Sequence, residues 1–524
     1  MRVHLVHPSD TAYGTAVVTP RWLFVLAAAT PRKFGDPLLI DESLAPFDLD
    51  TVQRGDVVGI GIHTANALRG YTLGKLARER GAYVIFGGIH PTIFPDEPHE
   101  TGGAHSVVRG DGDLIWAQVL EDCTSGTLGR VYEGGRVSSE SFKSARWDLL
   151  PPKKYMWATV QTLRGCPKHC SFCSVWKTDG QKPRQRTSDA VVEELVELRR
   201  RGFRYVVLAD DNFYPVSLTD LKLAAKNNPG RLSELQAIRA ERFELMSRLS
   251  RLPSDMVFFT QITMEAAEDP DFLQAMHRAH IKGALVGIEA VTPEGLKDVF
   301  KDFNSAGEEL VQRLRTFRKH GVHVLGSFIF GLPSDRENTF AATAAVAERA
   351  DLAFAQFVML TPFPGTVDYK KWENEMGGNV THISGVPITR RWLIPHEQRP
   401  KLYCKHPVMS EEDIRQRTQA VWDSFYSLPS IWRRAQFIKT LKNRLAFVLI
   451  SKIYRQMYAD TGIANDSARA ARSTKFVRWL TVPCQRLFAG RPMPDLQVPQ
   501  HNTVVLQNLT TVSTYPKLES CSPE

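Results

Sequence analysis

The sequence predicts an α/β protein with three consecutive parts: a doubly wound parallel sheet, a partial βα barrel and a mainly helical C-terminal region. Two observations support this prediction. Short apolar runs rich in Val and Ile alternate with stretches of helical periodicity over residues 1–380, and such alternation is typical of parallel sheets covered by helices on both faces. Glycines and polar residues follow the apolar runs, at the strand ends where such sheets bind ligands.

We expect the boundaries between these parts near residues 150, 380 and 497. The parallel sheet would occupy residues 1–150, the barrel 151–380 and the helical region 381–497. The polar tail over residues 498–524, rich in Thr and Ser, is expected to be disordered. A chain of 524 residues is long enough for several hydrophobic cores.

The first part contains four apolar strand signals and one clear helix. The helix is expected over residues 71–80 and ends at Gly81, because glycine commonly terminates helices. Residues 131–132 and 137 are expected to pair as a small hairpin within a turn-rich connector. The expected strands, in chain order, are residues 3–6, 56–62, 83–86 and 106–108.

The second part repeats the strand–helix alternation on a larger scale. Its best-signalled helix is residues 188–200, with Ser188 as a candidate N-cap and basic residues in its last turn. Other helices are expected at residues 270–280, 293–300 and 312–320. Strands are expected at residues 205–209, 258–264, 283–288, 322–330 and 354–360. The reactive face of such a barrel lies at the carboxyl ends of its strands.

The C-terminal region contains two further helical signals. Residues 409–412 (MSEE) have the character of a capping box before a helix. Apolar residues then recur at every fourth position, at Phe437, Leu441, Leu445, Leu449, Ile453 and Met457. We expect this stripe to pack against the core. Contact with a membrane surface is the alternative, since basic amphipathic helices lie on anionic bilayers.

The net charge of +9 is concentrated in one segment of the chain. Between Ile431 and Leu480, eleven Lys and Arg residues stand against only two acids. Such a block favours an acidic partner such as phosphate, a lipid headgroup or RNA. The simpler interpretation is a solvated basic helix face.

Cysteine usage and hydropathy indicate the cellular compartment. Seven cysteines in 524 residues, of which three are clustered, do not form a disulfide framework. The sequence does not open with a secretory signal, and no apolar run approaches the length of about 18 residues that a membrane span needs. We therefore expect a cytoplasmic protein that is associated with a membrane at most peripherally.

Three of the cysteines form the most informative pattern in the sequence. Cys166, Cys170 and Cys173 lie in GCPKHCSFC, with the spacing C-x3-C-x2-C. Thiolates are soft ligands that hold iron–sulfur clusters or zinc. Three cysteines on a cluster with four iron corners leave one iron open. With His169 as a fourth ligand, the same residues would close a tetrahedral zinc site, although structural zinc modules usually present two separated ligand pairs.

This spacing, with aromatic Phe172 before the third cysteine, resembles the radical S-adenosylmethionine (SAM) superfamily. The resemblance implies that the three cysteines ligate a [4Fe-4S] cluster and that SAM chelates its open iron. An external electron donor of the flavodoxin or ferredoxin type would reduce the cluster, and cleavage of SAM would yield a 5′-deoxyadenosyl radical. Phe172 would lie against the adenine, and Glu289 would accept hydrogen bonds from the ribose hydroxyls. The other SAM contacts that the resemblance implies are Asp210, Asp211, Asn212, Gly326 and Ser327.

The first part resembles the cobalamin-binding domain that is fused to many radical SAM proteins. The resemblance rests on GGIHPTIFPDE (residues 87–97) and VVRGDGD (residues 107–113). None of the fifteen histidines has Asp two positions before it, so the D-x-H-x-x-G motif that ligates cobalt elsewhere is absent. We expect cobalamin bound without an imidazole ligand; the alternative is a domain that has lost the cofactor. The implied cobalamin contacts are Thr64, Gly87, Gly88, His90 and Gly110.

Taken together, these resemblances imply a cobalamin-dependent radical SAM enzyme. The leading hypothesis is a methyltransferase acting on an unactivated carbon of a small-molecule or lipid substrate. A second hypothesis is a cyclase or rearrangement enzyme related to the anaerobic magnesium-protoporphyrin ester cyclase. A third is a non-enzymatic zinc or RNA-binding protein, which leaves the strand-end features at residues 209–212, 289 and 326–331 unexplained. No specific nucleic acid is expected as a partner.

Overall fold

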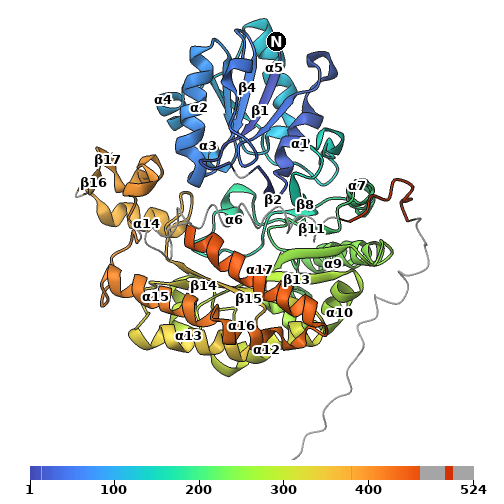
Figure 1. Ribbon diagram of the computed structural model, residues 1–524, viewed down its shortest axis with the longest axis vertical. Helices are drawn as coiled ribbons and strands as arrows, with labels where there is room; N and C mark the ends of the chain where they lie inside the picture. Colours follow the sequence, from blue (N-terminus) through green and yellow to red (C-terminus); the bar gives the residue numbers. More distant parts are fainter. Residues whose placement is uncertain (13, 379, 401, 461–489, 500–524) are drawn as a thin grey trace, which may run out of the picture.

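The computed structural model describes residues 1–12, 14–378, 380–400, 402–460 and 490–499. It confirms the α/β class and contains two large parallel sheets in separate layers, with the N-terminal unit at the top of Figure 1. The N-terminal sheet has the strand order β3-β1-β4-β5-β6-β7, with every neighbouring pair parallel. Its strands are β1 (Val3–His7), β3 (Leu38–Asp41), β4 (Val57–Gly61), β5 (Tyr83–Gly87), β6 (Ser106–Arg109) and β7 (Val131–Glu133).

Helices cover both faces of the N-terminal sheet, as a doubly wound arrangement requires. Alternate strand residues belong to opposite cores: Leu5 and Ile85 pack with Trp116, whereas Ile60 and Phe86 lie in the core on the other side. This division follows from the two-residue period of a strand, which sends successive side chains to opposite faces. The covering helices are α1 (Arg21–Ala29), α2 (Ala67–Glu79), α3 (Ile89–Ile93), α4 (Glu97–Thr101) and α5 (Trp116–Ser125).

The expected hairpin at residues 131–137 is wrong. Residues 131–133 form β7, which pairs parallel with β6 and so extends the sheet at its edge. Val137 belongs to no strand; its side chain is fully buried, and its backbone N–H donates to Asp111 Oδ2 at 2.7 Å. Two glycines, Gly134 and Gly135, let the chain turn away directly after β7.

The second sheet is a curled half-barrel, which confirms the predicted partial barrel. Its order is β15-β14-β13-β12-β11-β8-β2, again with every neighbouring pair parallel. The edge strand β2 (Ala16–Val18) comes from the N-terminal segment of the chain and pairs with β8. The other strands are β8 (Tyr155–Val160), β11 (Tyr205–Leu208), β12 (Val257–Ile262), β13 (Ile281–Glu289), β14 (His323–Phe330) and β15 (Phe354–Met359).

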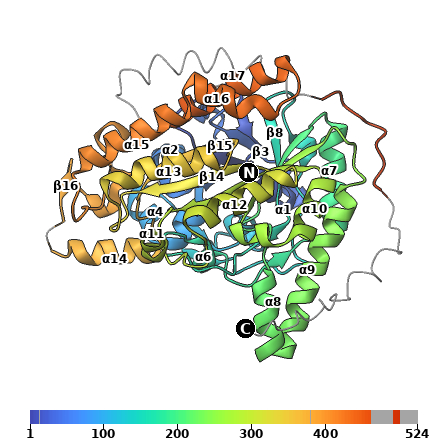
Figure 2. The same cartoon turned by 90° about the horizontal axis from the view of Figure 1, so that it is seen from below.

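The helices that follow these strands match the predicted periodicity, with one corrected cap. Thr187, rather than Ser188, is the N-cap of α7, because its hydroxyl accepts the backbone N–H of Ala190. A helical hairpin that was not predicted projects from the molecule (Figure 2) and consists of α8 and α9. The helices are α6 (Val175–Thr178), α7 (Ser188–Arg200), α8 (Leu218–Asn227), α9 (Pro229–Leu249), α10 (Pro270–Arg278), α11 (Pro293–Asp298), α12 (Gly307–Lys319) and α13 (Glu337–Arg349).

After β15 the chain returns to the N-terminal unit before it forms the last helices. Helix α14 (Val367–Met376) and a 3₁₀ segment (Ile388–Leu393) pack into the same core as α2, and Trp392 Nε1 donates to Glu97 Oε1 at 2.8 Å. Short strand pairs β9–β10 (Leu163–Arg164, Arg184–Gln185) and β16–β17 (His382–Ile383, Val386–Pro387) complete the sheets. The last helices are α15 (Glu411–Phe425), α16 (Leu428–Arg434) and α17 (Leu441–Asp460).

The capping box before α15 is present, and the stripe expected to pack over residues 437–457 packs only in part. Ser410 accepts the backbone N–H of Asp413, whose carboxylate bonds back to Ser410. On α17, Leu441 is 62 % exposed and Leu445 56 % exposed. The main packed face of α17 lies one to two residues further along the chain, because aromatic contacts to Phe354 and Trp422 select it. Phe437, before α17, packs against the core as expected. The packed residues are Phe447, Ser451, Tyr454 and Tyr458.

Part of the C-terminal prediction lies outside the described residues. Residues 461–489, which hold the second half of the basic block, and residues 500–524, which hold most of the tail expected to be disordered, are not among them. Among the described residues, no helix combines the length and the apolarity needed to cross a bilayer.

Candidate functional site

Two cavities lie at the carboxyl ends of the two sheets. The first, which we call the cluster cavity, has a volume of about 300 Å³ and is walled by Cys166, Cys170 and Cys173 together. The ends of β11, β12, β13, β14 and β15 form much of the remaining wall. The strand-end residues that line it include Asp211, Asn212, Gln261, Ile262, Thr263, Gly287, Glu289, Ser327, Ile329, Val358 and Met359.

The three cysteines lie in the loop between β9 and α6, held by backbone hydrogen bonds. The N–H of Cys166 donates to Gly180 O at 3.0 Å, and Trp176 Nε1 donates to Cys170 O at 3.1 Å. Burial raises the pKa of Cys166 to about 12 and that of Cys173 to about 11. The thiols would therefore lose protons on binding a metal, as thiolate ligands must. Among the residues that the structure describes, no three His, Cys, Asp or Glu side chains converge on a single ion; these thiols surround a space instead.

The residues Asp210, Asp211 and Asn212, which follow β11, have three different environments. Asp210 is buried outside the cavity wall; its Oδ1 accepts the N–H groups of Thr162 at 2.6 Å and Leu163 at 2.9 Å. Asp211 lines the cavity and accepts the Gly165 N–H at 2.7 Å, and burial raises the pKa of Asp211 to about 7. The sequence placed all three at SAM, whereas the structure brings only Asp211 and Asn212 to the cavity.

Asn212 presents a buried donor to the cavity that has no partner among the described residues. Its Oδ1 accepts the N–H groups of Tyr214 and Thr263, whereas its Nδ2 makes no hydrogen bond. The hydroxyl of Thr263, also on the cavity wall, is buried and without a partner as well. Because buried polar groups are almost always hydrogen-bonded, these two atoms fit a polar ligand in the cluster cavity.

Glu289 forms a buried ion pair that the sequence did not reveal. Its backbone has the left-handed φ of 67°, and its Oε1 accepts a hydrogen bond from Lys301 Nζ at 2.8 Å. Lys301 also donates to Gly287 O at 2.9 Å. A Cβ at Gly287 would lie 2.3 Å from Glu289 Oε1 and 2.5 Å from Lys301 Nζ, so a side chain there would displace the ends of the ion pair. Burial lowers the pKa of Lys301, but Glu289 more than compensates, and the net pKa is raised.

Phe172 and Ser327 also line the cluster cavity, but Gly326 does not. Phe172 packs against a small apolar core that includes Leu296 and Ile329. The hydroxyl of Ser327 accepts a hydrogen bond from Gln356 Nε2 at 2.8 Å. A Cβ at Gly326 would come within 2.7 Å of Leu352, so that glycine serves the packing behind β14.

The second cavity, which we call the strand-end cavity, lies between the N-terminal sheet and the loop that carries the cysteines. Its volume is about 480 Å³, and Gln161 and Arg164 of the second unit form part of its wall. Gly87, Gly88 and Gly110 line it as expected, but Thr64 and His90 do not. Gly88 and Gly110 have φ values of 102° and 75°, which a residue with a side chain rarely adopts.

His90 is occupied by a buried network behind the strand-end cavity. Its Nε2 lies 2.9 Å from Glu97 Oε1, and its Nδ1 lies 3.2 Å from the hydroxyl of Thr64. Trp392 contacts the ring edge-on, with 5.1 Å between centroids. Burial raises the pKa of Glu97, but hydrogen bonds from His90 and Trp392 lower it more, and the net pKa is lowered. The role of His90 in the structure is therefore to hold this network together.

Two other histidines, His7 and His63, line the strand-end cavity. Burial lowers the pKa of both, and His63, beside His7 and His90, falls to about 4. His63 Nδ1 accepts the Ala65 N–H at 3.2 Å, and His7 Nδ1 lies 3.4 Å from Trp22 Nε1. In this arrangement each neutral ring carries its proton on Nε2, so both present donors rather than metal-binding lone pairs.

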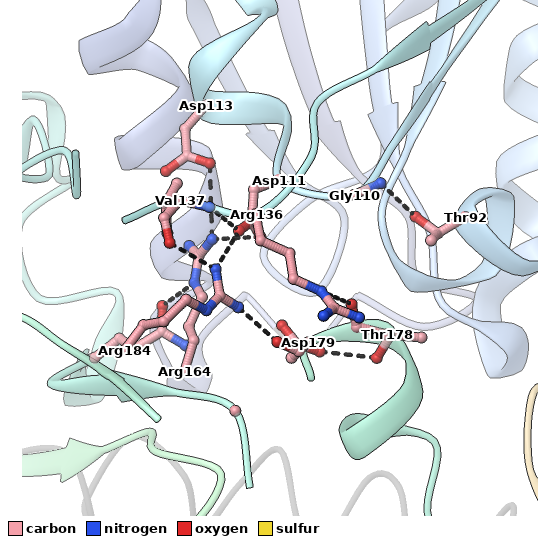
Figure 3. Close-up of polar contacts among 12 residues, drawn as sticks. Thr92, Gly110, Asp111, Asp113, Arg136, Val137, Arg164, Thr178, Asp179 and Arg184 are labelled. Carbon is pink, nitrogen blue, oxygen red and sulfur yellow. Dashed lines mark hydrogen bonds and ion pairs between the residues drawn. The ribbon is translucent and has the colours of Figure 1, made fainter. Parts of the chain in front are cut away.

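An ionic bridge joins the N-terminal unit to residues on either side of the cysteine loop (Figure 3). Asp111 of the N-terminal unit accepts Arg164 Nη1 at 2.6 Å and Arg184 Nη1 at 3.0 Å, one on each carboxylate oxygen. Arg164 lines the strand-end cavity, and two residues later the chain reaches Cys166. Arg136 adds two hydrogen bonds to the backbone oxygens of Lys177 and Thr178. The loop that carries the cysteines is therefore fixed directly to the N-terminal unit.

The substitution D111N is expected to loosen this connection. The amide keeps the size of the carboxylate but leaves Arg164 and Arg184, which are 15 % and 12 % exposed, without their shared counter-charge. Loss of one partner from a largely buried ion pair should cost about 2 kcal/mol here, after allowing for partial exposure. Hydrogen exchange should become faster over residues 164–185. The variant D271N, on an exposed carboxylate of α10, is the control; equal exchange in D111N and the wild type would contradict the prediction.

The comparisons with known proteins agree with this geometry. Residues 160–347 match the family model described as the radical SAM superfamily. An uncharacterised methyltransferase of Pyrococcus horikoshii is 27% identical over 466 residues, covering 82% of this chain and 94% of the relative. The bacteriochlorophyllide d C-12(1)-methyltransferase of Chlorobaculum tepidum is 27% identical over 374 residues, covering 68% of this chain and 74% of that protein.

A solved structure shares the whole architecture. The cobalamin-dependent S-adenosylmethionine radical enzyme OxsB, with aqua-cobalamin and S-adenosylmethionine bound, superimposes with a TM-score of 0.64 at 11% identity. The match covers 94% of this chain and 77% of OxsB. At this identity the likeness shows a common fold, with both large sheets included.

Proposed function

We propose that this chain, which carries a radical SAM domain over residues 160–347, is a cobalamin-dependent enzyme that methylates an unactivated carbon of a small-molecule or lipid substrate. The observation that carries the proposal is the pair of cavities at the carboxyl ends of the two sheets. Arg164, in the wall of the second cavity, stands two residues before Cys166 in the wall of the first. One presents three thiols and unpartnered polar atoms, and the other presents a glycine-rich cradle.

The cluster cavity fits an iron–sulfur cluster with bound SAM. Cys166, Cys170 and Cys173 would hold three irons, which leaves the fourth open to SAM. Asn212 Nδ2 can donate to the SAM carboxylate, and Asp211 can accept from its amino group. One oxygen of Glu289 is taken by Lys301, and the other remains for the ribose hydroxyls.

The strand-end cavity fits the cobalamin that the fold relatives carry. Gly87 leaves the backbone open to a large ligand, because a Cβ there would meet nothing closer than Val108 O at 3.8 Å. Gly59 and Gly61 instead make room for the wall residues Trp116 and Trp22, since their Cβ atoms would lie 2.9 Å and 2.6 Å from those rings. Wall residues from α1 and α5 extend this space beside the sheet. The Nε2–H groups of His7 and His63 are suited to donate to the carbonyl oxygens of the corrin amides.

When bound, the cofactors supply the reactivity: the reduced cluster cleaves SAM to a 5′-deoxyadenosyl radical, and cobalamin carries the methyl group. The protein aligns the groups, and the hydrogen bond from Arg164 to Asp111 holds the cysteine loop against the N-terminal unit. A walled cavity also keeps water away from the reacting carbon. Cleavage consumes one electron for each SAM, so an external low-potential donor of the flavodoxin or ferredoxin type completes the proposal.

The proposal is tested with full-length protein that has been reconstituted under anaerobic conditions with iron, sulfide and hydroxocobalamin. We expect four irons, one bound cobalamin and formation of 5′-deoxyadenosine under reduction. With methyl-labelled SAM and an extract of candidate substrates, label should appear in a carbon-bound methyl group. One equivalent of zinc without sulfide would refute the enzymatic reading, and ring closure without label would favour the cyclase hypothesis.

The substitution K301M is expected to weaken SAM binding. Without the ammonium, Glu289 is left as an uncompensated buried carboxylate and is no longer held in place. Hydrogen bonds to charged groups are worth about 1.5–3 kcal/mol, which corresponds to a loss of about 10- to 100-fold in affinity. Equilibrium titration of SAM into cluster-loaded protein measures the effect. The conservative variant K301R should recover part of the affinity; unchanged binding in K301M, with full iron content, would show that the pair serves packing alone.

A further inference from the structure

The surface of residues 428–445 combines exposed apolar side chains with basic ones. Leu428 is 59 % exposed, Trp432 41 %, Leu441 62 % and Leu445 56 %. Leu428 and Trp432 stand one helical turn apart on α16, and Leu441 and Leu445 stand one turn apart on α17. Figures 1 and 2 show these two helices adjoining each other at the outside of the molecule. We call this stretch the 428–445 surface.

The charge of this surface has a single sign. Residues 428–445 contain Arg433, Arg434, Lys439, Lys442 and Arg444 but no Asp or Glu. Arg434 is buried and donates to backbone oxygens, and Arg433 pairs with Glu348. Lys439 and Lys442 are exposed, with no ion-pair partner among the described residues. Two ammonium groups therefore stand free beside the exposed leucines.

The exposure of this surface is built into the fold. The opposite face of α17 is anchored by Phe447, which lies 5.3 Å from Phe354 between ring centroids, and by Ser451, which is fully buried. The hydroxyl of Ser427 caps α16, and Ile431 is fully buried beneath it. The inner faces are fixed against the barrel, so Leu441 and Leu445 cannot turn inward without breaking those contacts.

We propose that the 428–445 surface docks on an anionic lipid membrane. Exposed Leu and Trp side chains, flanked by unpaired lysines and without neighbouring acids in this stretch, match the boundary between acyl chains and anionic headgroups. Trp432 suits this boundary because its ring is apolar and its indole N–H is polar. RNA would satisfy the lysines but would leave the four large apolar side chains in water. The sequence analysis gave membrane contact as an alternative to core packing, and this proposal assigns that contact to the 428–445 surface.

The test uses cofactor-loaded full-length protein and vesicle flotation. Vesicles of phosphatidylglycerol and phosphatidylcholine are compared with vesicles of pure phosphatidylcholine. We expect the protein to float with the anionic vesicles and to be released by high salt. The variant K439E/K442E should bind at least tenfold more weakly, since each basic residue near an anionic surface contributes about fivefold. The variant L441Q/L445Q should also lose binding, even at low salt.

A matched control comes from α8, where exposed Leu223 (54 %) lies between Lys222 and Lys226. The variants L223Q and K222E/K226E should float like the wild type. Formation of 5′-deoxyadenosine without vesicles reports the proposed function separately and should be unchanged in all variants. Flotation that none of the 428–445 variants reduces, tighter binding to an RNA oligonucleotide than to vesicles, or a dimer that L441Q/L445Q dissociates would overturn the membrane proposal.

Discussion

Replacement of any one of Cys166, Cys170 and Cys173 by alanine is expected to abolish cleavage of SAM. The three thiols line one cavity and are, in the proposal, the complete set of protein ligands to the cluster. A cluster that has already one iron open to SAM cannot lose a second ligand and remain stably bound. Iron and labile sulfide should fall well below four per chain, and formation of 5′-deoxyadenosine should become undetectable.

Two control variants make the result specific. The substitution C123A removes a buried thiol from the core between α5 and the N-terminal sheet and should leave the iron content unchanged. The substitution H169A distinguishes cluster from zinc, because His169 is exposed and would be the fourth ligand of a zinc site. Full iron and sulfide in H169A agrees with the cluster. Loss of metal in H169A, with zinc and no sulfide in the wild type, would contradict the assignment of an iron–sulfur cluster to the three cysteines.

The features that the sequence predicted well are local ones. A cysteine spacing, an apolar run or a capping box is contained in a few adjacent residues, so the cysteine loop, the principal strands and Ser410 were all visible before the fold. The same is true of Gly87 and Gly88, because the turn after β5 lies directly beside the strand signal. Periodicity is also local, yet it predicted the packed face of α17 only in part, since Leu441 and Leu445 are exposed. Contacts with Phe354 and Trp422 decided that face, and these residues are distant in sequence.

The features that the sequence did not reveal depend on pairs of distant residues. Lys301 carries no motif and reaches Glu289 only because α11 folds back over the end of β13. Asp111 and Arg164 are 53 residues apart. The local sequence around either residue does not indicate that it pairs with the other. His90 was assigned to cobalamin because it lies in the stretch GGIHPTIFPDE that carries the resemblance. Its actual partner, Glu97, lies seven residues further along and is buried with it. A local sequence pattern indicates where a residue lies in the fold but not which distant residue it contacts.

The substitution G87L is expected to remove cobalamin while it leaves cleavage of SAM intact. Gly87 lines the strand-end cavity, its backbone lies outside the left-handed region, and a Cβ there would meet nothing closer than Val108 O at 3.8 Å. A leucine can therefore be built without backbone strain, and its side chain fills space that the corrin would need. Overpacking of about 1–3 kcal/mol corresponds to a loss of about 5- to 150-fold in cobalamin affinity. Methyl transfer should fall at least in proportion.

The neighbouring glycines separate a blocked cavity from a damaged fold. The small substitution G87A should bind cobalamin nearly as well as the wild type. The substitution G88A should instead lower the stability of the protein, because its Cβ would lie 2.5 Å from Ile62 O at a φ of 102°. Absorbance of bound cobalamin and thermal unfolding together distinguish the two effects. If G87L binds cobalamin normally, the cofactor does not occupy the strand-end cavity. If G87L loses the iron–sulfur cluster as well, the two cavities are not independent, and the bridge through Asp111 and Arg164 must transmit the change.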